Sequence, residues 1–260
     1  MATQSFSDQM GNQVLLTRPP QRIVSLVPSQ TELLFDLGLD QTVLGITKFC
    51  IHPPDWLTRK VIVGGTKKFH FDIIDKLDPD LIIGNKEENY QEGIETLREK
   101  YTVWMSDIHT LESALSMITS IGQLVGKQET AIEISQRILK SFNNVKRFEG
   151  ESVLYLIWKK PWMAVGSNTF IHSLLTMLGL RNTLGLKTRY PELTQQEIRE
   201  LNADFIFLSS EPFPFDESHI DEIKRISPKS KILLVDGEMF SWYGSRLLQS
   251  SDYFNTLKLG

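Results

Sequence analysis

One long amphipathic segment, residues 127–148, constrains the fold of this chain more than any other feature of its sequence. Gly126 precedes the segment and Gly150 follows it, as expected at helix ends. At 1.5 Å per residue, a helix of this length spans roughly 33 Å, about the width of a small domain. We therefore expect one helix that joins two bodies. Its apolar face is spaced three or four residues apart and consists of Ala131, Ile134, Ile138, Phe142 and Val145.

Short apolar runs alternate with helical patterns on both sides of this segment. Residues 23–27 (IVSLV) predict a buried strand, and residues 153–158 open the second half of the chain in the same way. Ser29 with Glu32 three positions later has the spacing of a capping box, which predicts a helix start. Strands that alternate with helices indicate α/β layers.

The two halves also share sequence. Residues 33–39 match residues 174–180 at five of seven places, and residues 74–82 match residues 198–206 at four places. Leucine-rich helices that end in glycine also give such matches by chance, but two matches in the same order favour two similar lobes. The expected fold class is therefore α/β, with two Rossmann-like lobes and a ligand cleft where they meet. The expected boundaries are 1–126 for the N-terminal lobe, 127–148 for the connecting helix and 149–260 for the C-terminal lobe.

Composition and charge exclude several classes of protein. The formal net charge is −4 with both signs spread along the chain, which argues against binding to nucleic acid or to anionic membranes. Cys50 is the only cysteine, so no intramolecular disulfide is possible. No apolar run approaches the roughly 18 residues that span a bilayer. The first residues lack the basic and apolar regions of a secretory signal, so either the chain works in the cytosol or a leader was removed.

Residues 22–33 (RIVSLVPSQTEL) resemble the signature of the helical-backbone, or class III, substrate-binding proteins of ABC importers for vitamin B12, iron siderophores or haem. The resemblance is strongest to the vitamin B12-binding branch and continues through Gly45-Ile46-Thr47, Pro53-Pro54, residues 77–82 and Tyr243-Gly244-Ser245-Arg246. It implies a monomer that binds a cobalt or iron chelate, has no intrinsic cofactor and performs no catalysis. It also implies a periplasmic or membrane-associated location.

The resemblance further implies docking to a membrane permease. Family members present one acidic residue on each lobe to arginines of the permease, and the matching positions here are Asp72 and Gln196. A neutral amide cannot form the bidentate charged pair that arginine prefers, so Glu197 is the expected substitute in the second lobe. The alternative is that these are solvated polar groups at helix starts.

Candidate ligand residues in the first half follow predicted strands. Phe49 matches an aromatic residue that lines the pocket in the B12 branch, and His52 is a candidate axial ligand for the metal of a bound macrocycle. Thr66 and Asn85 stand where that branch has tryptophans, which predicts a more polar pocket and a charged or hydroxylated chelate. Glu87, next to Glu88, either contacts the ligand or belongs to a solvated loop.

In the second half, Arg246 could pair with a ligand carboxylate or amide oxygen, or with Glu238 in a salt bridge. Several aromatic residues lie near predicted strand ends, and Tyr190 matches a pocket aromatic of the B12 branch. Such residues often build core, but their position near loops favours a lined groove. These aromatic residues are Trp158, Trp162, Tyr190, Trp242 and Tyr243.

Two other functions remain possible from the sequence. A cytosolic ligand sensor could use the same scaffold. An enzyme could use Cys50 as its nucleophile and His52 as its base, although residues two apart on a loop are poorly oriented for that proton transfer. The alternative for this pair is a buried cysteine beside a histidine in a turn.

Overall fold

The structure is a computed structural model that describes residues 3–259, and it divides the chain into two compact units. Unit 1 contains the residues up to 108, residues 112–140 and residues 242–248. Unit 2 contains residues 109–111, residues 141–241 and the residues from 249 onward. Residues 242–248 thus belong to unit 1, although they come from the half of the sequence in which we expected the C-terminal lobe.

Unit 1 is built on a parallel sheet with the strand order β5-β4-β3-β8-β9. Its central strands are fully buried, which explains why they appear in the sequence as continuous apolar runs. The strands are β3 (Ile23–Ser25), β4 (Val43–Ile46), β5 (Val61–Ile62), β8 (Leu81–Asn85) and β9 (Val103–Ser106).

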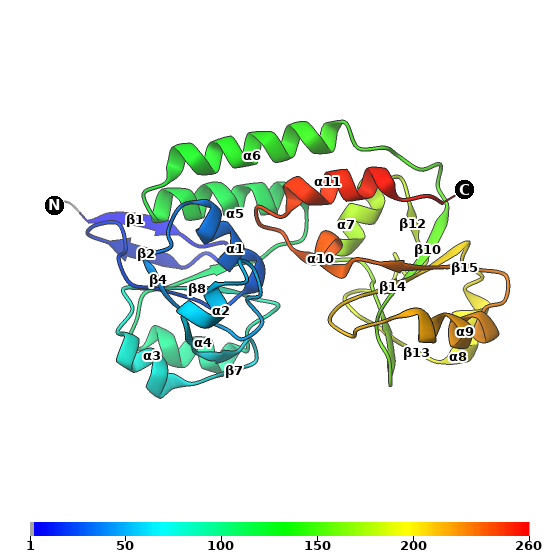
Figure 1. Cartoon of the computed structure of the whole chain (residues 1–260), viewed down its shortest axis with the longest axis horizontal. Coiled ribbons are helices and arrows are strands. Elements are labelled where there is room, and N and C mark those ends of the chain that lie inside the picture. Colours follow the sequence, from blue (N-terminus) through cyan, green and yellow to red (C-terminus); the bar gives the residue numbers. More distant parts are fainter. Residues whose placement is uncertain (1–2, 260) are drawn as a thin grey trace. The chain divides into compact units, whose positions relative to one another are not determined.

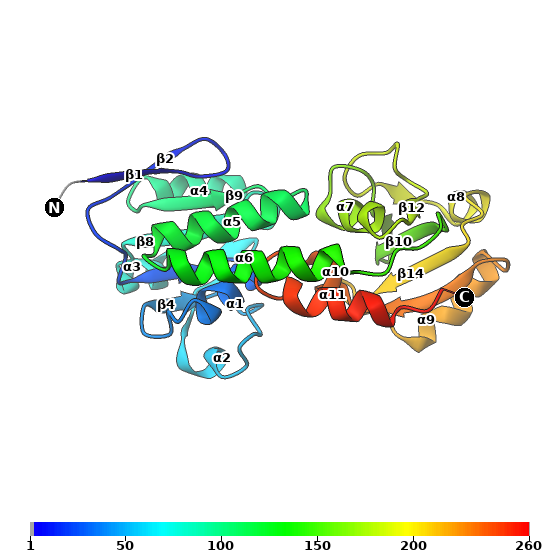
Figure 2. The same cartoon turned by 90° about the horizontal axis from the view of Figure 1, so that it is seen from above.

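Helices cover both faces of this sheet. Figures 1 and 2 show α5 on one side of the strands and α3 and α4 on the other. A small antiparallel pair, β6 (Gly64–Gly65) with β7 (Lys68–Phe69), follows β5. The helices of unit 1 are α1 (Pro28–Asp36), α2 (Trp56–Arg59), α3 (Phe71–Leu77), α4 (Gln91–Arg98) and α5 (Leu111–Leu124).

An N-terminal hairpin, β1 (Gln4–Ser7) with β2 (Gln13–Leu16), precedes the sheet and was not expected from the sequence. The buried carboxylate of Asp8 closes its turn by accepting hydrogen bonds from the backbone N–H groups of Met10 and Asn12, at 3.0 and 2.7 Å. Arg98 pairs with the same carboxylate at 3.1 Å. The hairpin is therefore attached to α4 by an ion pair with a distant residue, which local sequence patterns do not reveal.

Unit 2 has a six-stranded mixed sheet. The strand order is β13-β11-β10-β14-β15. β10, β14 and β15 run parallel to one another, and β11 runs antiparallel to both of its neighbours, β10 and β13. The short strand β12 also pairs with β10, in parallel. Its strands are β10 (Ser152–Trp158), β11 (Trp162–Ala164), β12 (Arg181–Asn182), β13 (Glu192–Leu193), β14 (Phe205–Ser209) and β15 (Lys231–Val235). Its helices are α7 (Phe170–Met177), α8 (Gln195–Glu200), α9 (Glu217–Ile226) and α10 (Gly237–Ser241). A further helix, α11 (Leu247–Thr256), begins in unit 1 and continues into unit 2.

The first internal repeat of the sequence corresponds to one structural motif used twice. α1 and α7 are each followed directly by Leu-Gly-Leu. The glycine has a positive φ in both, +77° at Gly38 and +79° at Gly179. In both helices, the N–H of the leucine after the glycine bonds back to a carbonyl of the last turn, at 3.1 Å from Leu39 and 2.9 Å from Leu180. This is a Schellman-type end, and it requires glycine at that position. The expected α/β class with two similar bodies is confirmed.

The second repeat is also structural. α3 and α8 both lead into a central strand through a residue in the left-handed region, Asp78 with φ 43° and Asn202 with φ 42°. Aspartate and asparagine tolerate this conformation better than most residues. Asp72 and Gln196 are each the second residue of their helix, so the structure confirms that they are equivalent positions.

Two local expectations were wrong. The long helix α6 is Gln128–Asn143 and ends five residues before the expected Phe148. Asparagine is a weak helix former, and short-range bonds from Asn144 and Val145 to carbonyls three residues earlier close the last turn. Ser29 does not cap α1. The N-cap residue is Val27, and no side chain caps the first turn of this helix. Glu32 has a different partner, described below.

Replacing Gly38 or Gly179 by alanine tests this motif, because the two variants can be compared with each other. At Gly38 an added Cβ meets nothing within 4 Å, so Gly38→Ala should cost only the backbone strain, about 1–2 kcal/mol. At Gly179 the Cβ would lie 2.4 Å from the carbonyl oxygen of Phe148, so the loss should be larger by about 1–3 kcal/mol. Urea unfolding of the two variants measures both values, and equal losses would contradict the assignment.

Candidate functional site

The candidate site of unit 1 lies at the carboxyl ends of its parallel strands, where open α/β sheets bind ligands. β3, β4 and β8 end there at Ser25, Ile46 and Asn85. Three segments follow or join these ends: residues 47–52, residues 85–90, and residues 242–246, which return from the C-terminal part of the chain. Most of the candidate residues from the sequence fall on these segments.

Asn85 organises the loop of residues 85–90 from inside. Its side chain is 1% exposed, and its Oδ1 accepts hydrogen bonds from the backbone N–H groups of Glu87 and Glu88, at 2.8 and 3.1 Å. Its Nδ2 donates to Ser106 Oγ at 2.9 Å, and Gln30 Nε2 donates to the same oxygen at 2.5 Å. Asn85 therefore holds the two glutamates in place, and its amide faces the protein interior.

Asn89 ties the same loop to two neighbours. Its Oδ1 accepts a bond from the N–H of Asn85 at 2.9 Å, and its Nδ2 donates to the carbonyls of Leu26 and Thr66, at 3.3 and 3.1 Å. Thr66 is half-buried, and this bond places it beside the loop. Neither Asn85 nor Thr66 supplies the flat apolar area that a tryptophan would give at these positions.

Phe49 is the exposed aromatic residue of this edge, with 49% of its surface accessible. The ammonium of Lys48 lies 5.0 Å from the centre of its ring. A Cβ at Gly65 would lie 3.2 Å from Phe49 Cε2, so the glycine lets the ring approach the backbone closely. Phe49 offers an accessible apolar surface next to Thr66.

Cys50 is fully buried beneath this surface. Thr31 Oγ1 donates to its sulfur at 3.1 Å, and Thr47 Oγ1 lies 3.2 Å from it. Burial raises the pKa of the Cys50 thiol to about 11, although the threonine hydrogen bonds act in the opposite direction. At neutral pH the group is a neutral thiol, which is neither a good nucleophile nor a metal ligand.

A buried ion pair attaches residues 242–248 to unit 1. Arg246 donates to both carboxylate oxygens of Glu32, at 2.8 and 2.7 Å, and the two side chains are 7% and 10% exposed. The guanidinium also lies 5.0 Å from the ring centre of Trp242. Of the two roles expected for Arg246, the salt bridge forms, but its partner is Glu32 rather than Glu238.

The burial of Glu32 explains why its carboxylate needs Arg246 as a partner. Burial raises the pKa of Glu32 above its usual value, and the hydrogen bond and charge of Arg246 oppose that shift. A carboxylate buried there without the arginine would be costly. This role replaces the capping box that the spacing of Ser29 and Glu32 predicted.

Tyr243 connects the returning segment to the glutamate loop. Its hydroxyl donates to Glu88 Oε1 at 2.6 Å, and the side chain is only 6% exposed. Gly244 follows, and a Cβ there would lie 2.3 Å from the carbonyl oxygen of Ser29. Glycine is therefore required for the segment to pass over the start of α1. Trp242 and Tyr243, both expected near the site, are brought to unit 1 by these contacts.

His52 is half-buried on the loop after β4, with its ring edge-on to Trp242 at 5.3 Å between centroids. His52 thus belongs to the cluster around Arg246. Among residues 3–259, no group of three or more His, Cys, Asp or Glu side chains is arranged to hold a metal ion, so an axial contact to a chelated metal stays a prediction.

The aromatic candidates of unit 2 differ in exposure. Trp158 ends β10 with 38% of its surface exposed and lies edge-on to Phe213 at 5.7 Å. Trp162 is buried and stacks on Phe215 at 6.3 Å, so it belongs to the core of unit 2. Tyr190 is half-buried beneath the guanidinium of Arg189, at 5.7 Å. Trp158 is the most accessible of the three.

A cavity of about 390 Å³ in unit 2 is lined by residues of α7, among them His172. Asn182 Nδ2 donates to His172 at 3.1 Å and to the carbonyl of Val165 at 3.0 Å, while its Oδ1 accepts a bond from the N–H of Leu184. These backbone partners fix the amide, so Nδ1 of His172 is an acceptor and Nε2 carries the proton. Burial lowers the pKa of His172, which favours the neutral ring.

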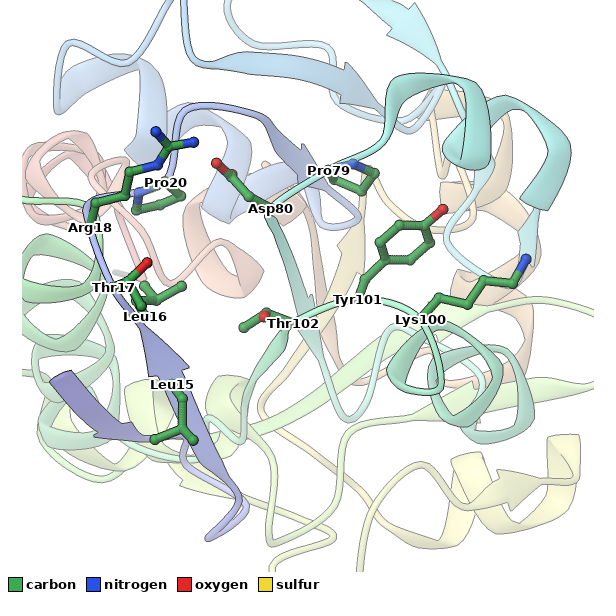
Figure 3. A pocket seen from close by; sticks show the side chains of 10 residues that line it. All are labelled: Leu15, Leu16, Thr17, Arg18, Pro20, Pro79, Asp80, Lys100, Tyr101 and Thr102. Atoms are coloured by element: carbon green, nitrogen blue, oxygen red, sulfur yellow. The ribbon is translucent and has the colours of Figure 1, made fainter. Parts of the chain in front are cut away.

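Another cavity of about 320 Å³ lies in unit 1 at the opposite, amino-terminal ends of β8 and β9 (Figure 3). Its polar groups serve the local structure. Lys100 and Tyr101 both bond to Asp75, at 2.9 and 2.6 Å, and Asp80 accepts the N–H groups of Gln21 and Arg22. Because α/β sheets bind ligands at their carboxyl ends, this cavity is the weaker candidate.

The buried pair makes a quantitative prediction. Arg246→Met or Glu32→Leu leaves a buried charge without its partner and should lower the free energy of unfolding by about 3–5 kcal/mol. The double variant Glu32→Leu/Arg246→Met should lose much less, because neither charge remains. Urea unfolding in a double-mutant cycle gives the coupling. Arg59→Ala, which breaks the exposed pair with Asp40, is the control and should lose far less. Additive losses at Glu32 and Arg246 would contradict the assignment.

Several curated proteins are similar to this chain in sequence, and two of them are described here. An uncharacterized ABC transporter substrate-binding lipoprotein of Bacillus subtilis, YvrC, is 23% identical over 214 residues, which cover 78% of this chain and 68% of the relative. A cobalamin-binding protein of Halobacterium salinarum is 22% identical over 208 residues, which cover 76% of this chain and 56% of that protein. The chain thus spans about two thirds of the first relative and little more than half of the second.

A solved structure agrees in fold. The periplasmic vitamin B12 binding protein BtuF of Vibrio cholerae superimposes with a TM-score of 0.77 at 18% identity, over 92% of this chain and 96% of that one. The sequence model of the periplasmic binding protein family matches residues 23–226, which is most of the chain. The resemblance seen in residues 22–33 is confirmed, and the chain belongs to the periplasmic binding protein family.

Proposed function

We propose that this chain is the substrate-binding protein of an ABC importer and that it captures a metal chelate of the corrinoid, haem or ferric siderophore type. The observation that carries the proposal is the family match over residues 23–226. The relatives named as a cobalamin-binding protein and as a transporter lipoprotein support it. In this function the protein holds its ligand and delivers it to a permease at the outer face of the membrane, as a monomer and without chemical change.

The carboxyl edge of unit 1 supplies the binding surface in this proposal. Phe49 contributes apolar area, and the loop around Glu87 contributes polar groups. The binding surface is supported by three residues beneath it, each only 6% exposed: Trp242, Tyr243 and Arg246. Trp158 and Tyr190 in unit 2 stay predicted ligand contacts.

Docking to the permease is proposed through Asp72, which is exposed in the first turn of α3. The equivalent position on α8 is less suited. Gln196 donates to Glu200 at 2.8 Å, and the carboxylate of Glu197 accepts bonds from the N–H and hydroxyl of Thr194, at 2.7 and 2.9 Å. These bonds lower the pKa of Glu197 and occupy it as a helix cap. We therefore propose that docking depends more on Asp72 than on Glu197.

No helix among the described residues is both long and apolar enough to cross a membrane. A cytosolic ligand sensor on the same scaffold is the alternative to an importer subunit. Binding of a permease in detergent or nanodiscs, and its loss in Asp72→Asn, would favour the importer. Ligand binding with no permease contact would favour the sensor.

Ligand titration tests the proposal directly. Purified protein is titrated with cobalamin, haem and ferric siderophores while tryptophan fluorescence is recorded, and at least one should bind at micromolar concentration or below. Phe49→Ala should weaken that binding about 5- to 30-fold, because the loss of an aromatic contact costs roughly 1–2 kcal/mol. Phe35→Ala, which removes a comparably exposed ring on α1, is the matched control. The absence of binding to all three classes would refute the proposed function.

The enzyme alternative predicts a reactive thiol, whereas the structure predicts an inert one. Because the pKa of Cys50 is raised to about 11, a thiol reagent at pH 8 should label the folded protein at least 100-fold more slowly than the urea-unfolded chain. Mass spectrometry of samples taken over time gives both rates. Rapid labelling of the folded protein would revive a nucleophilic role for Cys50.

A further inference from the structure

The strand β15 forms an open edge of the unit 2 sheet. It pairs with β14 on one side, and no other described strand pairs with it. The other edge strands of the two large sheets are less accessible: β5 and β13 are two residues long, and all four residues of β9 are buried. In β15, four of five residues reach solvent, and only Val235 is buried. β15 is therefore the longest accessible edge of these two sheets, and such edges readily accept another strand.

The ladder with β14 leaves the backbone groups of Ile232 and Leu234 at this edge. The N–H of Lys231 bonds at 2.9 Å to the carbonyl of the residue before β14, and the carbonyl of Val235 accepts the N–H of the residue after β14 at 3.0 Å. In a parallel ladder, alternate residues of a strand bond to the same neighbour. The N–H and C=O groups of Ile232 and Leu234 therefore point to the open side, where an added strand would find both donors and acceptors.

Four cations gather at the start of β15. Lys224 and Arg225 lie in the last turn of α9, Lys229 lies in the turn that follows, and Lys231 is the first residue of β15. All four are exposed, and none forms a salt bridge with a carboxylate of residues 3–259. Asp221, one turn earlier on α9, accepts a bond from Arg225 through its backbone carbonyl, at 3.2 Å. This end of unit 2 is therefore locally positive, although the net charge of the chain is −4.

The turn between α9 and β15 is held in place. Ser227 and Ser230 are buried, with their hydroxyl oxygens 2.8 Å apart, and Ser230 Oγ donates to the carbonyl of Ala203 at 2.6 Å. Arg199 of α8 donates to the carbonyl of Ile226, the last residue of α9, at 3.0 Å. The cations thus belong to a fixed turn beside the open edge.

We propose that the edge of β15 is the docking site for an extended, acidic segment of a partner protein, which adds to the sheet as a further strand. In strand addition, main-chain hydrogen bonds supply affinity and side chains supply specificity. The outward groups of Ile232 and Leu234 supply the first, and the four cations attract the acidic side chains. The same cations repel a basic strand, so they restrict which segments can pair here. This inference goes beyond the proposed function and does not depend on the ligand.

Peptide titration followed by two-dimensional amide NMR tests the site. The probes are acetylated peptides of about seven residues, near the usual length of a strand. One alternates glutamate with valine, one alternates lysine with valine, and one is the glutamate peptide with N-methyl groups on its consecutive central amides. The glutamate peptide should shift the amide signals of Ile232 and Leu234 and bind at or below about 1 mM, at least about 10-fold more tightly than the other two. The lysine peptide lacks the complementary charge, and the methylated peptide cannot complete the ladder.

Charge reversal at the cluster separates its role from that of the backbone. Lys224→Glu/Lys229→Glu should weaken binding of the glutamate peptide at least about 5-fold and strengthen binding of the lysine peptide. Lys68→Glu/Lys76→Glu, the same charge change at exposed positions of unit 1, is the control and should alter neither affinity by more than about 2-fold. Thermal unfolding shows that both variants are folded.

Three results would overturn this inference. The first is the absence of binding by the glutamate peptide. The second is equal binding of the glutamate peptide and its methylated form, with signals shifted at the cations but not at Ile232 and Leu234, because that would be adhesion of an anion alone. The third is a dimer that forms through β15 in sedimentation without peptide, because a second copy of the chain would then occupy the edge. Each of them leaves the proposed function standing, since the titration with metal chelates is independent of this edge.

Discussion

The ion pair between Glu32 and Arg246 determines where the last part of the chain runs. It joins two residues 214 positions apart and is almost completely buried, so neither charge can be left without the other at low cost. Around it, Trp242 covers the guanidinium and Gly244 passes over the carbonyl of Ser29. The result is that residues 242–248 become part of unit 1 and complete the surface at the carboxyl ends of its strands.

The same edge depends on buried amides as much as on charges. Asn85 and Asn89 use both ends of their side chains to fix residues 85–90. These internal hydrogen bonds hold the polar residues of the loop in a defined arrangement. Phe49 is the accessible apolar surface beside Thr66.

Much of the fold could be predicted from the sequence, because it depends on local patterns. The Leu-Gly-Leu repeats predicted two equivalent helix ends, and both glycines adopt the same left-handed conformation. The parts that were missed depend on distant partners. Ser29 and Glu32 have the spacing of a capping box, yet Glu32 pairs with Arg246, and the N-terminal hairpin is held by Asp8 and Arg98. Asn85 was predicted to contact a ligand, and spacing alone could not show that its side chain is buried.

The burial of Cys50 has a practical consequence for work on this protein. Since it is the only cysteine in the sequence and its thiol is enclosed by Thr31 and Thr47, it will not compete with a cysteine introduced at the surface. A fluorophore or spin label can therefore be attached to one chosen position without first removing the native residue. Pairs of such labels, one in each unit, would give distances between the units in solution.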